Sequence, residues 1–348
     1  MGRRIWLVLA WMLPAATGVA TGAVAAETAW GPAEVVGRTI EPGTADRFPF
    51  IPDTSYQASL LNIPVFVARG ARPGPTLCLT AGIHGDEISG VEVARRAFVG
   101  TDPTRLSGML ITLPMLNADG FRSGSRYLPD RRDLNRYFPG SSRGSVASII
   151  AGAVFTHVIR NCDALIDLHT ASFHRTNAPQ IRVDVDHDRS FELARHFGGA
   201  IIIAGEGPSG SLRREAVEAG VPAIIYEAGE PMRFELDKIE PGVEGVRSVM
   251  RFLGMIEGEA DVISADRIFV GSTWSRVPTG KAGFFFPEVG LGDRVTKGQT
   301  VGYVVDPLTD VRTPALAHRA GEVIGAAVAQ PVLSGYALFH IGEGGAAD

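Results

Sequence analysis

Cysteine is scarce in this chain of 348 residues, which contains only Cys78 and Cys162. Their spacing matches no zinc-binding cysteine motif, so a metal site built from thiolates is excluded. Each cysteine lies in or beside an apolar run that is typical of a buried strand. Because buried free cysteines are common, we predict two free thiols. A disulfide is the alternative, if the two strands are neighbours and the protein is exported to an oxidising compartment.

The chain also lacks an excess of positive charge and, beyond residue 25, any apolar run long enough to cross a membrane. Its formal net charge is -5, which excludes the basic surface that nucleic-acid binding requires. Hydrophobic residues make up 45% of the chain and charged residues 20%, and these are the proportions of a globular protein. We therefore expect no nucleic-acid partner and, after residues 1–25 are removed, a soluble protein without membrane attachment.

Residues 1–25 have the pattern of a secretory signal peptide. Arg3 and Arg4 precede an apolar run over residues 5–19, and an A-x-A cleavage site follows at residues 23–25. The alternative is a membrane anchor, but a spanning helix needs about 20 predominantly apolar residues, and Pro14 interrupts this run. The pattern predicts export to the periplasm or secretion, and the paired arginines are also compatible with twin-arginine export.

The order of apolar segments after the signal peptide indicates an α/β fold. Continuous runs rich in Val, Ile and Leu are typical of central strands in a parallel or mixed sheet, and segments that can form helices separate them. The predicted strands are residues 76–80, 109–113, 164–168 and 223–226, and the predicted helices are residues 90–99, 146–159, 190–197 and 243–255. This alternation predicts an α/β domain over about residues 40–257, and we assign residues 26–257 to this first domain.

The residue pattern is different in residues 258–348, where short runs of strand-forming residues alternate with glycines. We predict a small all-β domain there. Residues 292–298 and 321–323 resemble the barrel-sandwich domains that carry biotin or lipoyl groups. A carrier domain needs a lysine on the hairpin between those segments, and residues 304–319 contain none. The expected role is therefore structural or pocket-shaping.

Polar residues follow the predicted strands at their carboxyl ends, where open α/β sheets bind ligands. His84 and Glu87 follow the first strand, and His169 follows the third. Catalytic zinc takes three ligands from His, Asp or Glu and keeps one position open. His84 and Glu87 share a face if the chain turns into a helix there, and Gly82 and Gly85 relax the backbone at that turn. We predict one zinc ion per chain.

The remaining histidines give weaker signals. His157, His187 and His196 fall on helical or loop segments and are expected at the surface, and His318 and His340 lie in the β-rich part, away from the strand ends. His174 follows His169 closely and is a candidate to line the pocket.

Four ordered motifs carry a resemblance to a known family. They are Ile-His-Gly-Asp-Glu at residues 83–87, Asp-Leu-Asn-Arg-Tyr-Phe-Pro-Gly at 133–140, Asp-Leu-His-Thr at 167–170 and Glu-Ala-Gly at 227–229. Together they resemble the succinylglutamate desuccinylase/aspartoacylase family, which is related to the zinc carboxypeptidases. The resemblance runs from about residue 63 to the carboxyl terminus, and it implies a zinc-carboxypeptidase-like mixed sheet with flanking helices, followed by a small all-β domain.

The resemblance also implies roles in catalysis. Glu227 would act as general base and then general acid, with Glu230 as the competing candidate. Arg126 would stabilise the oxyanion that forms at the attacked carbonyl. Because the segment up to Asp133 differs in length from that of some relatives, Arg122 and Arg131 are alternatives.

Two further roles follow from the second motif. Asn135 and Arg136 resemble the pair that holds the carboxylate of the substrate, for which a guanidinium offers two parallel donors. Asp133 would accept a hydrogen bond from the non-ligating nitrogen of His84 and so fix its tautomer. Asp167 is the alternative partner for this histidine.

These roles predict a zinc-dependent deacylase that cleaves the amide of an N-acyl amino acid or a similar small carboxylate-bearing amide. A periplasmic metallocarboxypeptidase for short peptides would use the same residues. A non-catalytic binding protein with a relic fold is a third hypothesis. The retained ligands, glutamate and arginines argue against it, because loss of the metal or the base is expected in a relic.

Overall fold

The structure is a computed structural model that describes residues 30–51 and 62–344. The predicted signal peptide at residues 1–25 lies outside the described residues. Within the described ranges, no helix combines the length and the apolar character that a membrane span requires.

The central strands of the main sheet are the four that the apolar runs predict: β5 (Arg72–Ala81), β6 (Ser107–Leu113), β7 (Ala164–His169) and β10 (Ala223–Gly229). β6 and β7 flank β5, and β10 lies beyond β7, and all four strands are parallel. Every residue of β7 is buried, as expected for a strand that is covered on both faces. The carboxyl ends of these strands therefore lie along one edge of the sheet.

Antiparallel strands extend the sheet on both sides, so it is mixed. β3 (Thr44–Phe50) and β4 (Ile63–Arg69) lie beyond β6, and β8 (Arg175–Val183) lies beyond β10. β9 (Ile201–Ala204) pairs with β8 and with β11 (Ile268–Phe269), while β1 (Ala33–Val35) and β2 (Arg38–Ile40) form a separate ribbon.

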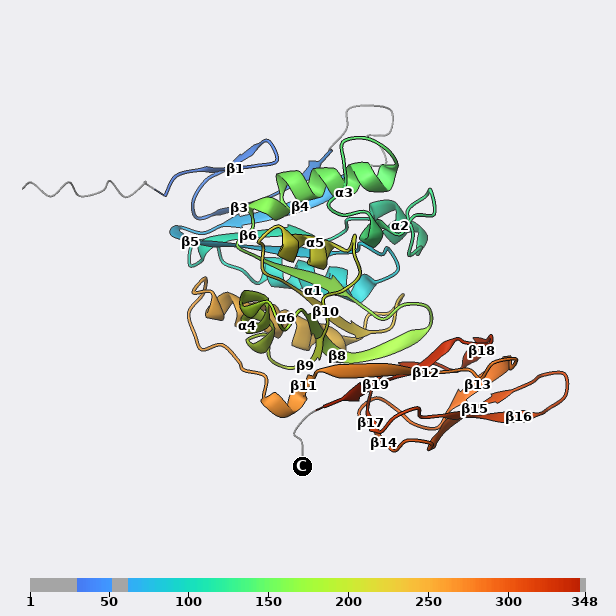
Figure 1. Cartoon of the computed structure of the whole chain (residues 1–348). Helices are drawn as coiled ribbons and strands as arrows, with labels where there is room; N and C mark the ends of the chain where they lie inside the picture. The colour runs from blue at the N-terminus through green and yellow to red at the C-terminus, as the bar shows by residue number, and fades with distance from the viewer. Residues whose placement is uncertain (1–29, 52–61, 345–348) are drawn as a thin grey trace, which may run out of the picture. The chain divides into compact units, whose positions relative to one another are not determined.

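Helices cover both faces of the main sheet (Figure 1). The helices are α1 (Ile88–Val99), α2 (Ala118–Ser123), α3 (Val146–His157), α4 (Asp188–Arg195), α5 (Leu212–Glu218) and α6 (Leu236–Phe252), with 3-10 turns at Leu134–Arg136, Ile159–Asn161 and Ala265–Arg267. α3 and α5 contribute Val154 and Leu212 to one apolar core. α1, α4 and α6 contribute Val93, Leu193 and Val246 to a second core on the other face. The predicted α/β fold is confirmed.

The β-rich carboxyl-terminal part continues the main sheet. Its strands are β12 (Gly271–Arg276), β13 (Gly283–Pro287), β14 (Arg294–Val295), β15 (Thr300–Val305), β16 (Arg312–Leu316), β17 (Gly321–Ala327), β18 (Gln330–Val332) and β19 (Ala337–Glu343). β16, β15, β13 and β18 form a second sheet, whereas β12, β19 and β17 join the main sheet where β17 pairs with β8. Pairing thus crosses the domain boundary that the sequence predicts after residue 257.

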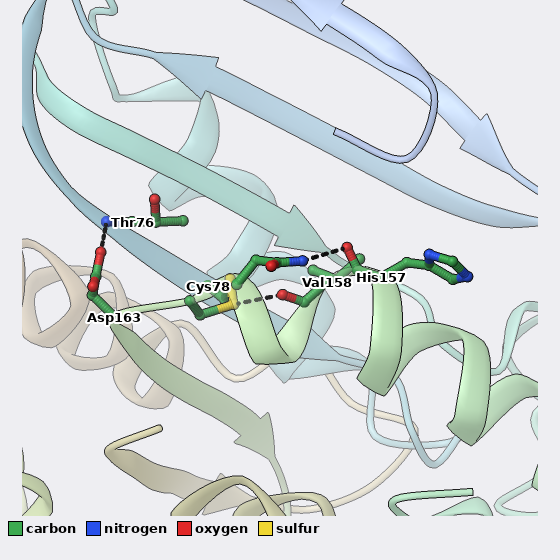
Figure 2. The surroundings of a disulfide bond; sticks show 7 residues. Thr76, Cys78, His157, Val158 and Asp163 are labelled. Atoms are coloured by element: carbon green, nitrogen blue, oxygen red, sulfur yellow. Dashed lines mark hydrogen bonds between the residues drawn. A yellow bond between two sulfur atoms is a disulfide. The ribbon is translucent and has the colours of Figure 1, made fainter. Parts of the chain in front are cut away.

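The two cysteines form a disulfide, and the prediction of free thiols is wrong (Figure 2). Cys78 lies on β5, and Cys162 lies just before β7, the parallel neighbour of β5. Their Cα atoms are 5.9 Å apart. The backbone N–H of Thr76 also donates to the Asp163 carboxylate at 2.7 Å, so the start of β7 is attached to β5 twice. The sequence alone did not show that these strands are adjacent.

Replacing both cysteines by alanine is expected to lower the free energy of unfolding by about 2–4 kcal/mol. The disulfide joins positions 84 residues apart, so it restricts a long segment of the unfolded chain. Urea unfolding of the wild type and of the Cys78→Ala/Cys162→Ala variant measures the difference. A reductant should remove most of the stability difference between the two proteins. Equal urea midpoints of the two proteins without reductant would contradict the prediction.

Candidate active site

The turn between β5 and α1 carries the first two predicted metal ligands. α1 begins only at Ile88, so His84 and Glu87 do not lie on a helix face, and that prediction is wrong. They approach each other through a tight turn, in which the Glu87 N–H donates to the His84 carbonyl at 3.2 Å. Gly82 supports the turn with a φ of +59°, a conformation that other residues rarely adopt.

Gly85 allows the turn to pack closely against α2. A Cβ at this position would lie 2.0 Å from the Gly120 carbonyl carbon at the start of α2. Only glycine allows this close approach of the two segments. Gly85 therefore fixes the turn against α2, where the sequence suggested only a relaxed backbone.

His84, Glu87 and His169 come together at the carboxyl ends of the strands, and one ligand atom from each lies within 4.8 Å of the others. All three side chains are buried. Glu87 lies between the imidazoles, with one carboxylate oxygen 2.8 Å from His84 Nδ1 and the other 2.7 Å from His169 Nδ1. The Nδ1 atom of each histidine therefore faces the centre of the cluster.

Each histidine has its own carboxylate on the outer side. His84 Nε2 lies 3.0 Å from Asp133, and His169 Nε2 lies 2.8 Å from Asp167. Because an ionised carboxylate only accepts, Asp133 and Asp167 hold a proton on each Nε2, and each Nδ1 would present its lone pair to a metal ion at the centre of the cluster. Asp133 thus has the contact with His84 that the sequence suggested, whereas Asp167 serves His169 instead.

The electrostatics of the cluster favour a positive charge at its centre. Burial would raise the pKa of Glu87, but His84 and His169 hold it well below its ordinary value. Burial opposes protonation of His169, but Asp167 and Glu87 raise its pKa well above the ordinary value. Three buried or half-buried carboxylates thus surround two imidazoles. Without a metal, protons on the imidazoles balance the negative charge of the carboxylates. A bound divalent cation would provide that positive charge instead.

The donor set fits a zinc ion. His84 Nδ1 is buried and has no hydrogen-bond partner among the described residues, although a Glu87 oxygen is close to it. Two such acceptor atoms repel each other unless a proton or a metal cation lies between them. Two imidazole nitrogens and one carboxylate are an established ligand set of catalytic zinc.

Arg126 is the arginine that reaches this cluster. It donates to Glu87 at 2.8 Å, and its other terminal nitrogen lies 3.4 Å from Asp133. The alternatives do not reach it, because Arg122 pairs with Asp119 near the surface and Arg131 is exposed. Of the three candidates, Arg126 is therefore the one that contacts the cluster.

Glu227 lies on β10, in register with His169 on β7. Asn177 donates to its carboxylate at 2.7 Å, and Arg182 Nε lies 2.7 Å from the other oxygen. Both partners come from β8, and sequence reasoning missed them because no motif marks that strand. Glu230 is 3.6 Å from Arg233 and does not line the active-site cavity.

A cavity of about 220 Å³ joins these groups. The predicted residues that line it are His84, Glu87, Arg126, Asn135, Arg136, His169 and Glu227, while Asp133 lies behind His84. Thr170, Ser172, Arg182, Ser211 and Arg213 also line it, and these were not predicted.

Asn135 and Arg136 reach the cavity from the 3-10 turn Leu134–Arg136. The Asn135 amide oxygen accepts from the Leu212 N–H at 2.8 Å, so its amide nitrogen stays available to a ligand. The Asp133 oxygen that contacts His84 also accepts from the Asn135 N–H at 3.0 Å. One carboxylate thus contacts both a metal-ligand candidate and the segment that is predicted to bind the substrate.

Two histidines differ from their predicted places. His174 does not line the cavity; its carbonyl accepts from the Gln330 side chain at 2.7 Å. His340 is not remote from the site, because Gly325 of β17 pairs with His340 on one side and with Asn177 on the other. The carboxyl-terminal strands therefore support Asn177, which holds Glu227.

Comparison with known proteins identifies the family. The succinylglutamate desuccinylase/aspartoacylase catalytic domain matches residues 73–253. The chain belongs to this family. N-alpha-acetyl-L-2,4-diaminobutyric acid deacetylase of Halomonas elongata is 29% identical over 270 residues, which cover 75% of this chain and 78% of that protein.

Solved structures of the family share the fold. The succinylglutamate desuccinylase/aspartoacylase of Rhodobacter sphaeroides has a TM-score of 0.73 at 25% identity, covering 81% of this chain and 89% of that one. The product-bound ectoine utilization protein EutE (DoeB) of Ruegeria pomeroyi has a TM-score of 0.76 at 24% identity, covering 87% and 97%. Family membership and the deacetylase relative identify the chain as a hydrolase that acts on amides.

Asp133→Asn is expected to weaken zinc affinity or activity by about 10- to 100-fold, the usual cost of losing the partner of a metal-bound histidine. The amide keeps the shape of the side chain but no longer fixes the His84 tautomer. Zinc titration and initial rates measure the effect. Asp130→Asn is the matched control, because Asp130 pairs with Arg132 in the same loop. Equal behaviour of the two variants would show that Asp133 does not orient His84.

Proposed function

We propose that this protein is a zinc-dependent deacylase that hydrolyses the amide bond of an N-acyl amino acid. The observation that carries the proposal is the convergence of His84, Glu87 and His169 in one cavity with Glu227 and Arg126. These groups provide a metal site, a proton carrier and an oxyanion donor, the three components that amide hydrolysis requires.

His84 Nδ1, His169 Nδ1 and the Glu87 carboxylate would hold one zinc ion per chain. A zinc ion held there would lower the pKa of a water molecule to about 7 and would polarise the carbonyl of the amide. Asp133 and Asp167 keep the Nδ1 lone pairs directed inward. Arg126 contacts Glu87 in this structure and would donate to the oxyanion that forms at the attacked carbonyl.

Glu227 takes the proton of the attacking water and returns it to the departing amine. Asn177 and Arg182 hold the carboxylate at the cavity wall, which limits its rotation. Asn135 and Arg136, on the 3-10 turn Leu134–Arg136, bind the carboxylate of the substrate. The Arg136 guanidinium provides two parallel donors. The scissile amide would then lie between the Asn135–Arg136 pair and the metal site.

The size of the cavity supports a small substrate. At about 220 Å³ it falls below the range of about 300–1,000 Å³ that is typical of sites for drug-sized ligands. An N-acyl amino acid suits this volume better than a longer peptide does. The similarity to a deacetylase of an acetylated amino acid supports the same class.

We also propose export to the periplasm or secretion. Residues 1–25 carry the signal pattern, and the Cys78–Cys162 disulfide supports the proposal because disulfides persist in oxidising compartments. Fractionation of cells that express the full chain tests it. The processed protein should appear outside the cytoplasm, and full-length protein in the cytoplasm would contradict export.

The decisive experiment offers the zinc-loaded protein a panel of N-acyl amino acids and dipeptides and measures released primary amine. Hydrolysis of N-acyl amino acids, with little release from dipeptides, is expected. Release from dipeptides alone would establish a carboxypeptidase instead. No release from any compound by protein that holds zinc would contradict a hydrolytic function of this site.

A further inference from the structure

His340 is a buried histidine of the carboxyl-terminal strands that the proposed reaction does not use. A row of paired residues connects it to the active site: His340 on β19 pairs with Gly325 on β17, and Gly325 pairs with Asn177 on β8. Directly paired residues of neighbouring strands present their side chains on the same face of a sheet. His340 therefore shares the face on which Asn177 donates to Glu227 at 2.7 Å.

Gly325 leaves space between the two side chains of this row. A Cβ at Gly325 would lie 2.5 Å from the Asn177 amide oxygen and 3.2 Å from the Cβ of His340. The first distance is too short for any side chain at this position, so only glycine lets Asn177 keep its place. The side chains of Asn177 and His340 thus adjoin the same point above Gly325.

Two atoms at this point lack the hydrogen bonds that buried polar groups normally make. Asn177 Oδ1 and His340 Nδ1 are both buried, and neither has a hydrogen-bond partner among the residues that the structure describes. The amide oxygen of Asn177 can only accept, whereas a ring nitrogen of histidine can donate. The two atoms are therefore complementary.

The surroundings keep the His340 ring neutral and fix its plane. Burial lowers the pKa of His340 to about 3, and the nearby cations Arg182 and Arg175 act in the same direction. The ring therefore carries one proton at neutral pH. It stacks on Trp274 with the ring centroids 4.6 Å apart and an angle of 2° between the planes. A neutral ring in a fixed plane offers a single N–H to an acceptor.

Gln180 is a second candidate donor to Asn177. It pairs with Glu227 across β8 and β10 and is buried, and neither end of its amide has a hydrogen-bond partner within the described ranges. The space above Gly325, however, lies between Asn177 and His340. This arrangement favours His340 as the donor.

We propose that His340 is a positioning residue for Glu227: its Nδ1–H donates to the Asn177 amide oxygen, directly or through one water molecule. This bond keeps the amide nitrogen of Asn177 directed at the Glu227 carboxylate. An amide turned by half a rotation would present its oxygen instead, and two acceptors repel each other. The inference rests on the proposed role of Glu227 as proton carrier, and it gives the carboxyl-terminal strands a part in catalysis.

His340→Leu removes the donor and is expected to lower kcat by about 5- to 50-fold, while KM and zinc content stay within about twofold of the wild type. His340 does not line the cavity, so only the step that uses Glu227 should be affected. His340→Asn should recover most of the loss, because its amide nitrogen can donate from a place near that of Nδ1. His318→Leu, at an exposed histidine, is the matched control. Unchanged kcat in folded His340→Leu, or equal losses in His340→Leu and His340→Asn, would overturn the proposal.

Asn177→Ala tests whether His340 acts through Asn177. In this background His340→Leu should change kcat by less than about twofold, because the group that His340 holds is already gone. Losses that multiply in the double variant would assign His340 a separate effect and overturn the proposal. Gln180→Met measures the competing donor. A loss of kcat in Gln180→Met with none in His340→Leu would transfer the role to Gln180.

Nitrogen NMR of zinc-loaded protein with 15N-labelled histidine separates this inference from the proposed function, because it needs no turnover. The His340 signals are identified by their disappearance in His340→Asn. From about pH 5 to 8 the His340 ring should be neutral, with its proton on Nδ1. That result supports the contact even if no amide is hydrolysed, and it decides the question if His340→Leu does not fold. A proton on Nε2 alone would overturn the proposal even if deacylation is observed.

Discussion

His169→Ala is expected to lower the zinc content from about one ion per chain to nearly none and to abolish hydrolysis. His169 supplies one of the three converging ligand atoms, and two ligands are too few for a stable catalytic zinc site. The loss of activity should exceed the roughly 100-fold effect expected when only an outer hydrogen-bond partner is removed. Metal analysis of dialysed protein and initial rates measure the two effects.

His169→Ala can also destabilise the fold, because it leaves Asp167 and Glu87 buried without the imidazole between them. Circular dichroism and thermal unfolding establish whether the variant keeps the fold. His318→Ala is the matched control, since His318 is an exposed histidine on the β-rich part of the chain. Full zinc occupancy in folded His169→Ala would refute this ligand assignment, and His84→Ala tests the second histidine in the same way.

The central strands could be predicted because burial on both faces leaves a direct trace in the sequence. β7 is buried along its whole length, and its run of apolar residues ends at His169. The same reasoning placed His84, Glu87 and Glu227 at neighbouring strand ends, because parallel strands bring their carboxyl ends to one edge of the sheet.

Other parts of the site depend on contacts between segments far apart in the chain. Asn177 and Arg182 reach Glu227 because β8 lies antiparallel to β10, and no local pattern indicates that pairing. Arg213 reaches the cavity from α5, and no motif marks that helix. The disulfide was missed for the same reason, since it depends on the adjacency of β5 and β7.

The predicted role of the helix at the metal site was wrong for a local reason. The spacing of His84 and Glu87 suits one face of a helix, but it equally suits a turn that ends at the helix start. Gly82 and the packing of Gly85 against α2 favour the turn. Spacing alone therefore identified the residues that converge without identifying the backbone that brings them together.

Glu227→Gln is expected to lower kcat by about 10² or more while zinc content and substrate affinity stay close to those of the wild type. The amide is nearly isosteric with the acid and keeps an oxygen that can accept from Asn177. It cannot take up a proton from water, however, so only the transition state loses an interaction. Steady-state kinetics, zinc analysis and calorimetric titration with the product measure the three quantities.

The substitution also breaks the ion pair with Arg182, and a second variant separates the two effects. Arg182→Gln removes the same ion pair but retains the carboxylate, so its kcat should fall much less. Equal losses in both variants would assign the effect to the ion pair. Loss of zinc from Glu227→Gln would make Glu227 a ligand. Near-normal kcat would transfer the catalytic role to Glu230, and Glu230→Gln should then show the loss, although Glu230 lies outside the lining of the cavity.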